Sequence, residues 1–140
     1  MNGDCIFCKI AAGELPSYTL FEDGEFKIIL DRYPWSRGHA LVLLKRHAKN
    51  IFELTEPEAS KLSAHVLRAA GAVNAALAPD GINILQNNGE AAGQSVGHFH
   101  THIIPRYQND EIDMLFPHSD PPREEFEAIL NKIKKYQPFG

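Results

Sequence analysis

A short stretch with alternating histidines constrains the fold of this chain more than any other feature. His98, His100 and His102 are separated by single residues within the run from Val96 to Ile104. Side chains alternate between the two faces of a β-strand, so a strand here would place all three histidines on one face. The other face would carry Phe99, Thr101 and Ile103. Three neighbouring imidazoles predict a polar cleft, where they can attack, donate protons or bind metal near neutral pH.

The bulk properties indicate an ordinary globular protein. The chain has 140 residues and a net charge of −4, so we expect a single domain over residues 1–140. An acidic chain lacks the basic surface that nucleic-acid backbones require, which argues against nucleic acid as the main partner. No apolar run is long enough to span a membrane, and the N-terminus lacks the features of a signal peptide. We therefore expect a cytoplasmic protein without a membrane partner.

The order of the expected elements predicts an α+β fold. Strand signals occur in five runs: Tyr18 to Phe21, Phe26 to Leu30, His39 to Leu44, Ile82 to Leu85 and Val96 to Ile104. Helical signals occur at Cys5 to Ala12, after Thr55 with Glu58 at capping-box spacing, and at Pro122 to Tyr136. There is no regular alternation of strands and helices. The pattern indicates a five-stranded, mostly antiparallel sheet with one long helix and a C-terminal helix.

From the residues alone, the histidine stretch is open to four interpretations. The imidazoles could line a polar face without any chemistry, or they could form an all-histidine metal centre. They could also act as acids and bases, or one of them could attack phosphorus or carbon as a nucleophile. Under the second interpretation, the three histidines could hold the zinc ion of a metal-dependent hydrolase.

Whole segments of the chain resemble the histidine-triad (HIT) family of nucleotide-binding proteins. The run from Gly93 to Arg106 is similar to the family signature, and Gly97 within it departs from the usual larger residue. Further similar segments occur in the family's order: Cys5 to Ile10, Asp31, Gly38 to Val42, Lys45 to His47 and Asn87 to Gly89. The resemblance implies a HIT-like fold, a homodimer with one continuous sheet, and binding of a purine nucleotide or nucleotide conjugate.

The resemblance also implies a reaction at the α-phosphate of a nucleotide. His100 would be the nucleophile that forms a covalent nucleotidyl intermediate, and His102 would contact the phosphate oxygens. Ser95 and Gln94 would lie beside the scissile bond, with Ser95 placed to protonate the leaving group. The substrate would be a nucleoside 5′-phosphoramidate or a dinucleoside polyphosphate. A nucleotide-binding sensor or scaffold with little turnover is the alternative.

Five further positions match nucleotide contacts of the family. Asn87 corresponds to a phosphate contact and Asp31 to a ribose contact. The base would lie between the apolar side chains of Ile6, Phe7 and Ile10. Without the resemblance, Asn87 and Asp31 are ordinary turn residues, and the three apolar residues are ordinary core.

The two cysteines form a second chemical feature. Cys5 and Cys8 provide two of the four ligands that a structural zinc requires. In zinc-bearing relatives, two histidines complete the site, and these correspond to His47 and His98. A redox-active pair is the alternative, although the βαβ setting of thioredoxin-like motifs is missing.

Two residues near these motifs have no fixed role at this point. His39 matches a further family histidine near the active site, but by sequence alone it is a structural residue at the start of a strand. Trp35 lies in the loop from Arg32 to Gly38, where it could line a cleft or a subunit contact.

Overall fold

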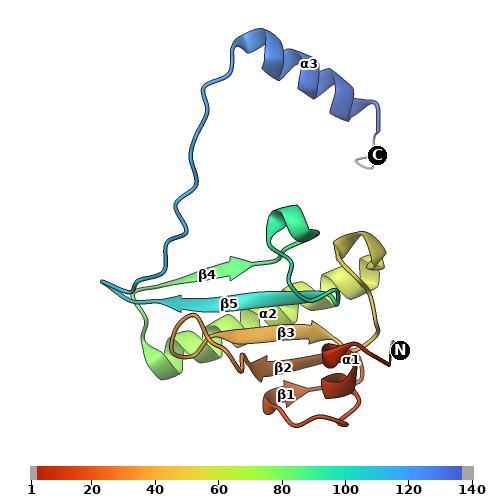
Figure 1. Ribbon diagram of the computed structural model, residues 1–140, viewed down its shortest axis with the longest axis vertical. Coiled ribbons are helices and arrows are strands. Elements are labelled where there is room, and N and C mark those ends of the chain that lie inside the picture. Colours follow the sequence, from red (N-terminus) through yellow and green to blue (C-terminus); the bar gives the residue numbers. More distant parts are fainter. Residues whose placement is uncertain (1–2, 137–140) are drawn as a thin grey trace.

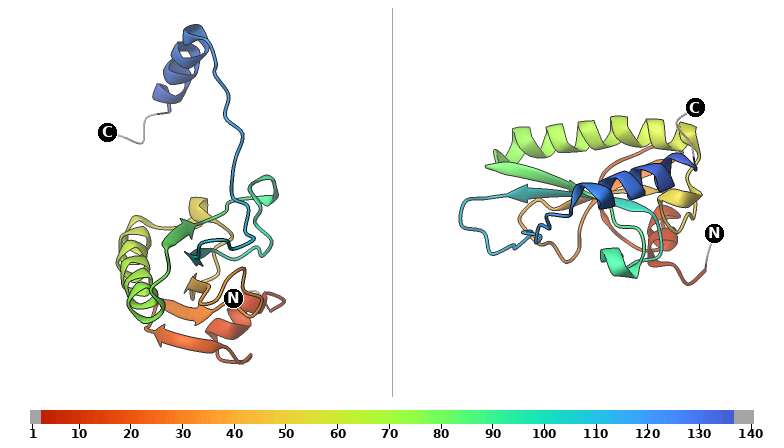
Figure 2. Two further views of the ribbon diagram at one scale, coloured as in Figure 1. Left: turned by 90° about the vertical axis from the view of Figure 1, so that its left-hand side faces the viewer. Right: turned by 90° about the horizontal axis from the view of Figure 1, so that it is seen from above.

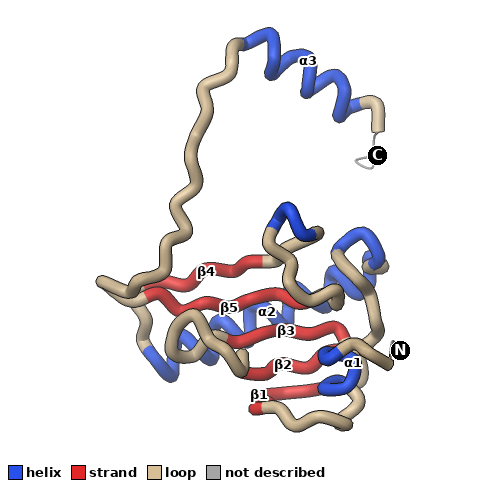
Figure 3. Tube along the Cα trace, viewed as in Figure 1, coloured by secondary structure: helices blue, strands red, loops and turns tan. Residues whose placement is uncertain are grey.

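A five-stranded sheet forms the centre of the computed structural model, which describes residues 3–136 (Figures 1 and 3). The strands are β1 (Tyr18–Glu22), β2 (Phe26–Leu30), β3 (Ala40–Leu44), β4 (Gly81–Leu85) and β5 (His100–Arg106). They lie in the order β1-β2-β3-β5-β4, and all neighbouring pairs are antiparallel. The α+β fold predicted from the order of the elements is therefore confirmed.

The long helix α2 (Glu56–Leu77) covers one face of the sheet (Figure 2). It begins as predicted, because Thr55 and Glu58 form a reciprocal capping box. Its predicted apolar stripe packs on the sheet: Leu62, Val66, Ala69, Val73 and Leu77. The helix ends at Leu77 and is capped by Ala78, whose backbone has a left-handed φ of 46°.

Strand β3 is buried on both faces, which explains its continuous apolar sequence. Val42 and Leu44 belong to the core beneath α2. Leu41 and Leu43 belong to a second core beneath α1 (Ile6–Ala11), on the opposite face. Figure 2 shows α1 and α2 on opposite sides of the sheet. The first helix and the end of β2 can therefore enclose a cleft that the long helix does not cover.

Strand β5 begins later than the sequence predicted. Its pairing with β3 starts where His100 lies opposite Leu43, and His102 lies opposite Leu41. Directly opposed residues share a face, so both histidines point to the α1 side. Phe99 donates its backbone N–H to the carbonyl of Ala48 at 2.7 Å, outside the strand ladder. His98 therefore precedes the strand, and the expected row of three strand histidines is corrected to two.

The C-terminal helix α3 (Arg123–Lys134) lies at the end of an extended segment, beyond the β4 edge (Figure 1). Its predicted apolar stripe is present but exposed: Phe126, Ile129, Leu130 and Ile133. Two short 3-10 helices precede β5 in the chain, η1 (Ile51–Glu53) and η2 (Glu90–Ala92). Within residues 3–136, no helix is both long and apolar enough to cross a membrane.

Candidate active site

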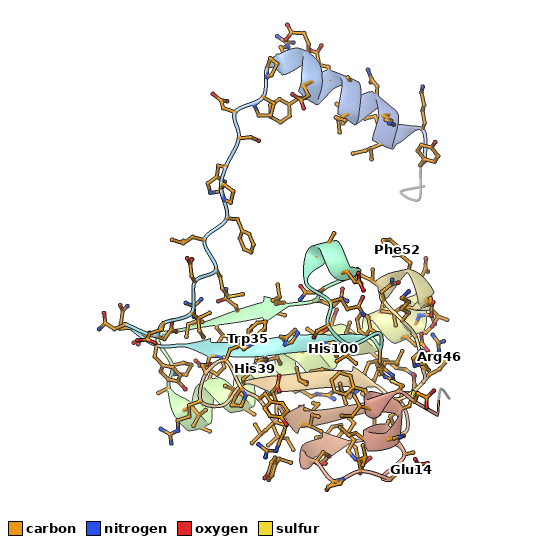
Figure 4. The ribbon with its side chains drawn as sticks, viewed as in Figure 1. Glu14, Trp35, His39, Arg46, Phe52 and His100 are labelled. Atoms are coloured by element: carbon orange, nitrogen blue, oxygen red, sulfur yellow. The ribbon has the colours of Figure 1, made fainter. Side chains whose placement is uncertain are left out.

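A cavity of about 580 Å³ lies between α1, the end of β2 and the face of β5 that carries His100 and His102. It brings together seven of the residues that the sequence assigned to nucleotide binding or catalysis: Ile6, Phe7, Ile10, Asp31, Ser95, His100 and His102. These residues come from four separate parts of the chain. Figure 4 shows His100, His39 and Trp35 gathered over strands β3 and β5.

His100 has one ring nitrogen occupied and one available. Its Nδ1–H donates to the carbonyl oxygen of His98 at 2.7 Å. The remaining nitrogen, Nε2, therefore carries the lone pair of the neutral ring. Burial lowers the pKa of His100, which is 6% exposed, so the ring is neutral near pH 7. Phe7 holds the ring edge-on, with the centroids 5.0 Å apart. This is the protonation state that a nucleophilic imidazole needs.

His102 is held in the complementary tautomer by a chain of hydrogen bonds. The backbone N–H of Trp35 donates to Nδ1 of His39 at 3.1 Å, so the proton of neutral His39 lies on Nε2. That Nε2–H then donates to Nδ1 of His102 at 2.9 Å. The proton of His102 consequently lies on Nε2, where it can be donated to a ligand. Burial, followed by the nearby His100 and His39, lowers the pKa of His102 to about 4.

Asp31 lies next to this chain of hydrogen bonds. Its Oδ1 accepts from the backbone N–H of Tyr33 at 2.9 Å, and its Oδ2 lies 3.6 Å from Nε2 of His39. Single ligand atoms of Asp31, His39 and His102 lie within 4.8 Å of one another. The tautomer argues against metal binding there, because Nε2 of His39 already carries a proton and Nδ1 faces the N–H of Trp35.

The second candidate site consists of two cysteines and two histidines. Nδ1 of His98 lies 3.3 Å from Sγ of Cys5 and 3.5 Å from Sγ of Cys8. Nδ1 of His47 lies 3.2 Å from Sγ of Cys8, and all four ligand atoms lie within 4.8 Å of one another. In a tetrahedral zinc site, the sulfur and nitrogen ligands are separated by roughly 3.6 Å. The four side chains therefore fit zinc.

The surroundings of His98 support the same conclusion. Its Nε2–H donates to the carbonyl of Leu44 at 2.6 Å, which leaves Nδ1 as the nitrogen that faces the two thiols. Cys5 also caps helix α1, because its Sγ accepts from the backbone N–H of Cys8 at 3.4 Å. A zinc ion held here would tie α1 to the segment just before β5. The metal cluster thus adjoins the candidate catalytic residue, since His98 also accepts the hydrogen bond from His100.

Gln94 and Asn87 lie in the loop before β5, outside the residues that line the cavity. Gln94 accepts from the N–H of Gly89 at 2.8 Å and donates to the carbonyls of Lys49 and Val96. Asn87 donates to the carbonyl of Gly93 at 3.4 Å. Both amides hold this loop in shape, and their expected contacts with a phosphate stay predictions.

Two residues at or directly behind the cavity received no firm role from the sequence. His39 is 1% exposed and bonds directly to His102, so it belongs to the site and not only to the start of β3. Trp35 lines the cavity, and its indole stacks on the ring of His102 with centroids 5.1 Å apart and an interplanar angle of 11°. No local pattern reveals this contact, because 67 positions separate the two residues in the sequence.

Comparison with known proteins identifies the family. The HIT domain pattern matches residues 12–109. The chain belongs to the HIT family. It is 46% identical to Protein hit of Bacillus subtilis over 104 residues, which cover 74% of this chain and 72% of that protein. It is also 39% identical to adenosine 5′-monophosphoramidase hnt1 of Schizosaccharomyces pombe, over 92% of this chain and 95% of that protein.

Solved HIT structures have the same fold. A HIT family protein from Bacillus subtilis superposes with a TM-score of 0.92 at 38% identity, covering 98% of this chain and 99% of the other. A zinc-bound histidine triad protein from Mycobacterium smegmatis superposes with a TM-score of 0.74 at 34% identity, covering 96% and 98%. The sequence-based recognition of the family and its fold is therefore confirmed.

Proposed function

We propose that the protein hydrolyses a purine nucleoside 5′-phosphoramidate or dinucleoside polyphosphate at its α-phosphate, through a covalent nucleotidyl-His100 intermediate. One observation carries the proposal. His100 directs an unprotonated Nε2 into a cavity, because its other nitrogen donates to the carbonyl of His98. Beside it, the tautomer of His102 offers an N–H to a phosphate oxygen. A nucleophile and a donor for developing negative charge are thus adjacent.

The chemistry would proceed in two displacements. Nε2 of His100 attacks the α-phosphorus, and the bond between phosphorus and the leaving group breaks. The leaving group takes a proton through the hydroxyl of Ser95, which lines the same cavity. Water then attacks the phosphorus and gives a proton back to the Ser95 oxygen. The bond between phosphorus and Nε2 breaks, which releases the mononucleotide and restores neutral His100. Two in-line displacements predict net retention of configuration at phosphorus.

The remaining assigned residues would position the nucleotide. The base would lie against Ile6, Phe7 and Ile10, and Asp31 would accept from the ribose hydroxyls. Gln94 and Asn87 would support the phosphate-binding loop and reach the ligand only if the loop rearranges. Activities of relatives agree with this reaction class: hnt1 of Schizosaccharomyces pombe is an adenosine 5′-monophosphoramidase.

Zinc would have a structural role in this protein. The ligand set of Cys5, Cys8, His47 and His98 is closed, and closed four-ligand sites are typical of structural zinc. The ion would hold His98, and with it the carbonyl that fixes the tautomer of His100. The cavity residues themselves would carry out the reaction.

The resemblance implies a homodimer with one continuous sheet, and we infer that two copies would associate through the edge of β4. Among residues 3–136 this strand pairs with β5 alone, and Ile84 on it is half-exposed. Leu67 on α2 is 73% exposed beside an apolar cavity of about 490 Å³ that also includes Ile84. We expect Leu67→Glu to convert a dimer into a monomer in light-scattering measurements. An unchanged mass for that variant, or a monomeric wild type, would contradict this arrangement.

Hydrolysis of adenosine 5′-phosphoramidate by the purified protein tests the proposed function. His100→Ala should reduce turnover by at least about a thousandfold, as expected for loss of a nucleophile. His118→Ala is the matched control, because His118 is exposed on the segment that leads to α3. Wild-type turnover in His100→Ala would refute the proposal. Tight binding of the mononucleotide with negligible turnover by the wild type would instead favour the sensor.

A further inference from the structure

The two cysteines of the metal cluster differ in their access to solvent. Cys5 is partly exposed at the start of α1, whereas Cys8 is buried and only 2% exposed. The ligand atoms of the cluster, both sulfurs among them, lie within 4.8 Å of one another. An oxidant can therefore reach Cys5, and Cys8 lies close enough to attack the oxidised sulfur. An accessible thiol beside a second, resolving thiol is the arrangement of redox-sensing cysteine pairs.

The cluster is connected to the candidate nucleophile in two ways. The backbone carbonyl of His98 accepts the hydrogen bond from His100, while the ring of His98 faces both sulfurs. Phe7 lies between the two cysteines in α1, and its ring centroid is 5.9 Å from that of His98 and 5.0 Å from that of His100. Cys5 also caps α1 through its Sγ. A change at the sulfurs therefore affects the proposed base wall and the proposed nucleophile together.

We propose that Cys5 and Cys8 form an oxidation site, at which hydrogen peroxide closes a disulfide, releases zinc and lowers the activity of His100. The effect on turnover rests on the proposed function, whereas the oxidation itself depends only on the cluster. The sequence left a zinc-binding pair and a redox-active pair open as alternatives. In this proposal they are two states of the same site.

The oxidation balances with peroxide as its only co-reactant. Zinc holds both sulfurs as thiolates. The Cys5 thiolate attacks the peroxide, which gives a sulfenic acid and hydroxide. The Cys8 thiolate then attacks the Cys5 sulfur, expels a second hydroxide and closes the disulfide. Two electrons pass from the sulfurs to the peroxide, and zinc leaves as the hydrated ion because His47 and His98 alone hold it weakly.

The test treats the zinc-loaded protein with hydrogen peroxide and measures the cluster and the activity separately. A chromogenic chelator should detect about one released zinc ion per chain, and mass spectrometry should find Cys5 and Cys8 joined in a disulfide. The kcat/KM for adenosine 5′-phosphoramidate should fall by roughly tenfold or more, which is typical when the surroundings of a metal site are disturbed. Dithiothreitol followed by zinc should restore the activity.

Cys5→Asp is the matched control, because a carboxylate can hold zinc and cap α1 but cannot form a disulfide. Comparing each protein before and after peroxide removes any difference in basal activity, and this variant should lose neither zinc nor activity on treatment. Retention of zinc by the treated wild type, a disulfide that leaves its kcat/KM unchanged, or an equal loss in Cys5→Asp would overturn the proposal. If the reduced protein hydrolyses nothing, the proposed function fails. NMR of the Nδ1 proton of His100 would then still show whether oxidation breaks its hydrogen bond to His98.

Discussion

Replacing His102 with asparagine should remove a pH dependence of stability that originates in the cavity. Burial, followed by His100 and His39, lowers the pKa of His102 to about 4, whereas an unfolded chain has a histidine pKa of about 6.5. Between these values, the unfolded chain binds a proton that the folded protein does not bind. The free energy of unfolding therefore falls as the pH falls from about 6.5 to about 4. Above that pH range the His102 ring is neutral in both states, so the unfolding free energy is no longer reduced by protonation of this residue.

The two pKa values set the size of the effect. Their difference corresponds to about 3.4 kcal/mol, since each pKa unit is worth about 1.4 kcal/mol. Between about pH 7.5 and about pH 5, the wild type should lose about 2 kcal/mol of unfolding free energy through this residue. The residue is 8% exposed, so solvent screens the effect only weakly. His102→Asn cannot take up the proton in either state. Its unfolding free energy should therefore fall by about 2 kcal/mol less than that of the wild type between the same pH values.

Urea unfolding of both proteins at the two pH values measures this difference. The cysteine and histidine ligands also respond to acid, but they are the same in both proteins and cancel in the comparison. His118→Asn changes an exposed histidine and should behave like the wild type. Equal losses in the wild type and in His102→Asn would refute the argument that the folded cavity keeps His102 neutral.

Three further predictions concern metal and stability. Elemental analysis should find about one zinc ion per chain, and Cys8→Ser should lose the metal and melt at a lower temperature; a full zinc content in that variant would contradict the proposed ligand set. Phe99→Ala should cost about 3–5 kcal/mol in urea unfolding, because Phe99 is fully buried beneath α2. Thr55→Ala should cost about 1 kcal/mol through loss of the capping box, and a change below the error of the fit would mean that this cap does not stabilise α2.

Local patterns predicted the elements of this fold well. The five strands, the capped helix and its apolar stripe each follow from alternation, helical spacing or capping residues within a few positions. The start of β5 is the main exception. His98 was expected on the strand, but its ring is held by Leu44 and two thiols, and Phe99 bonds to Ala48. The long-range partners in these contacts are not visible in the local sequence.

The candidate site depended on the family resemblance and on contacts across the chain. The resemblance identified the positions that gather at the cavity and at the metal cluster. It did not reveal that Trp35 stacks on His102, because that contact joins a loop to a distant strand. Nor did it show which nitrogen of His102 carries the proton, since that depends on a backbone N–H near His39. A single domain over residues 1–140 stays a prediction, because the family match covers residues 12–109.

The covalent intermediate on His100 is the central claim, and mass spectrometry tests it most directly. The protein is mixed with a slowly hydrolysed adenosine phosphoramidate, stopped with base to preserve the phosphorus–nitrogen bond, and digested. We predict an adenylyl group on the peptide that contains His100, at its Nε2 nitrogen, and no such adduct in His100→Ala. Turnover of the substrate with no adduct on His100, or with an adduct on another residue, would contradict the account.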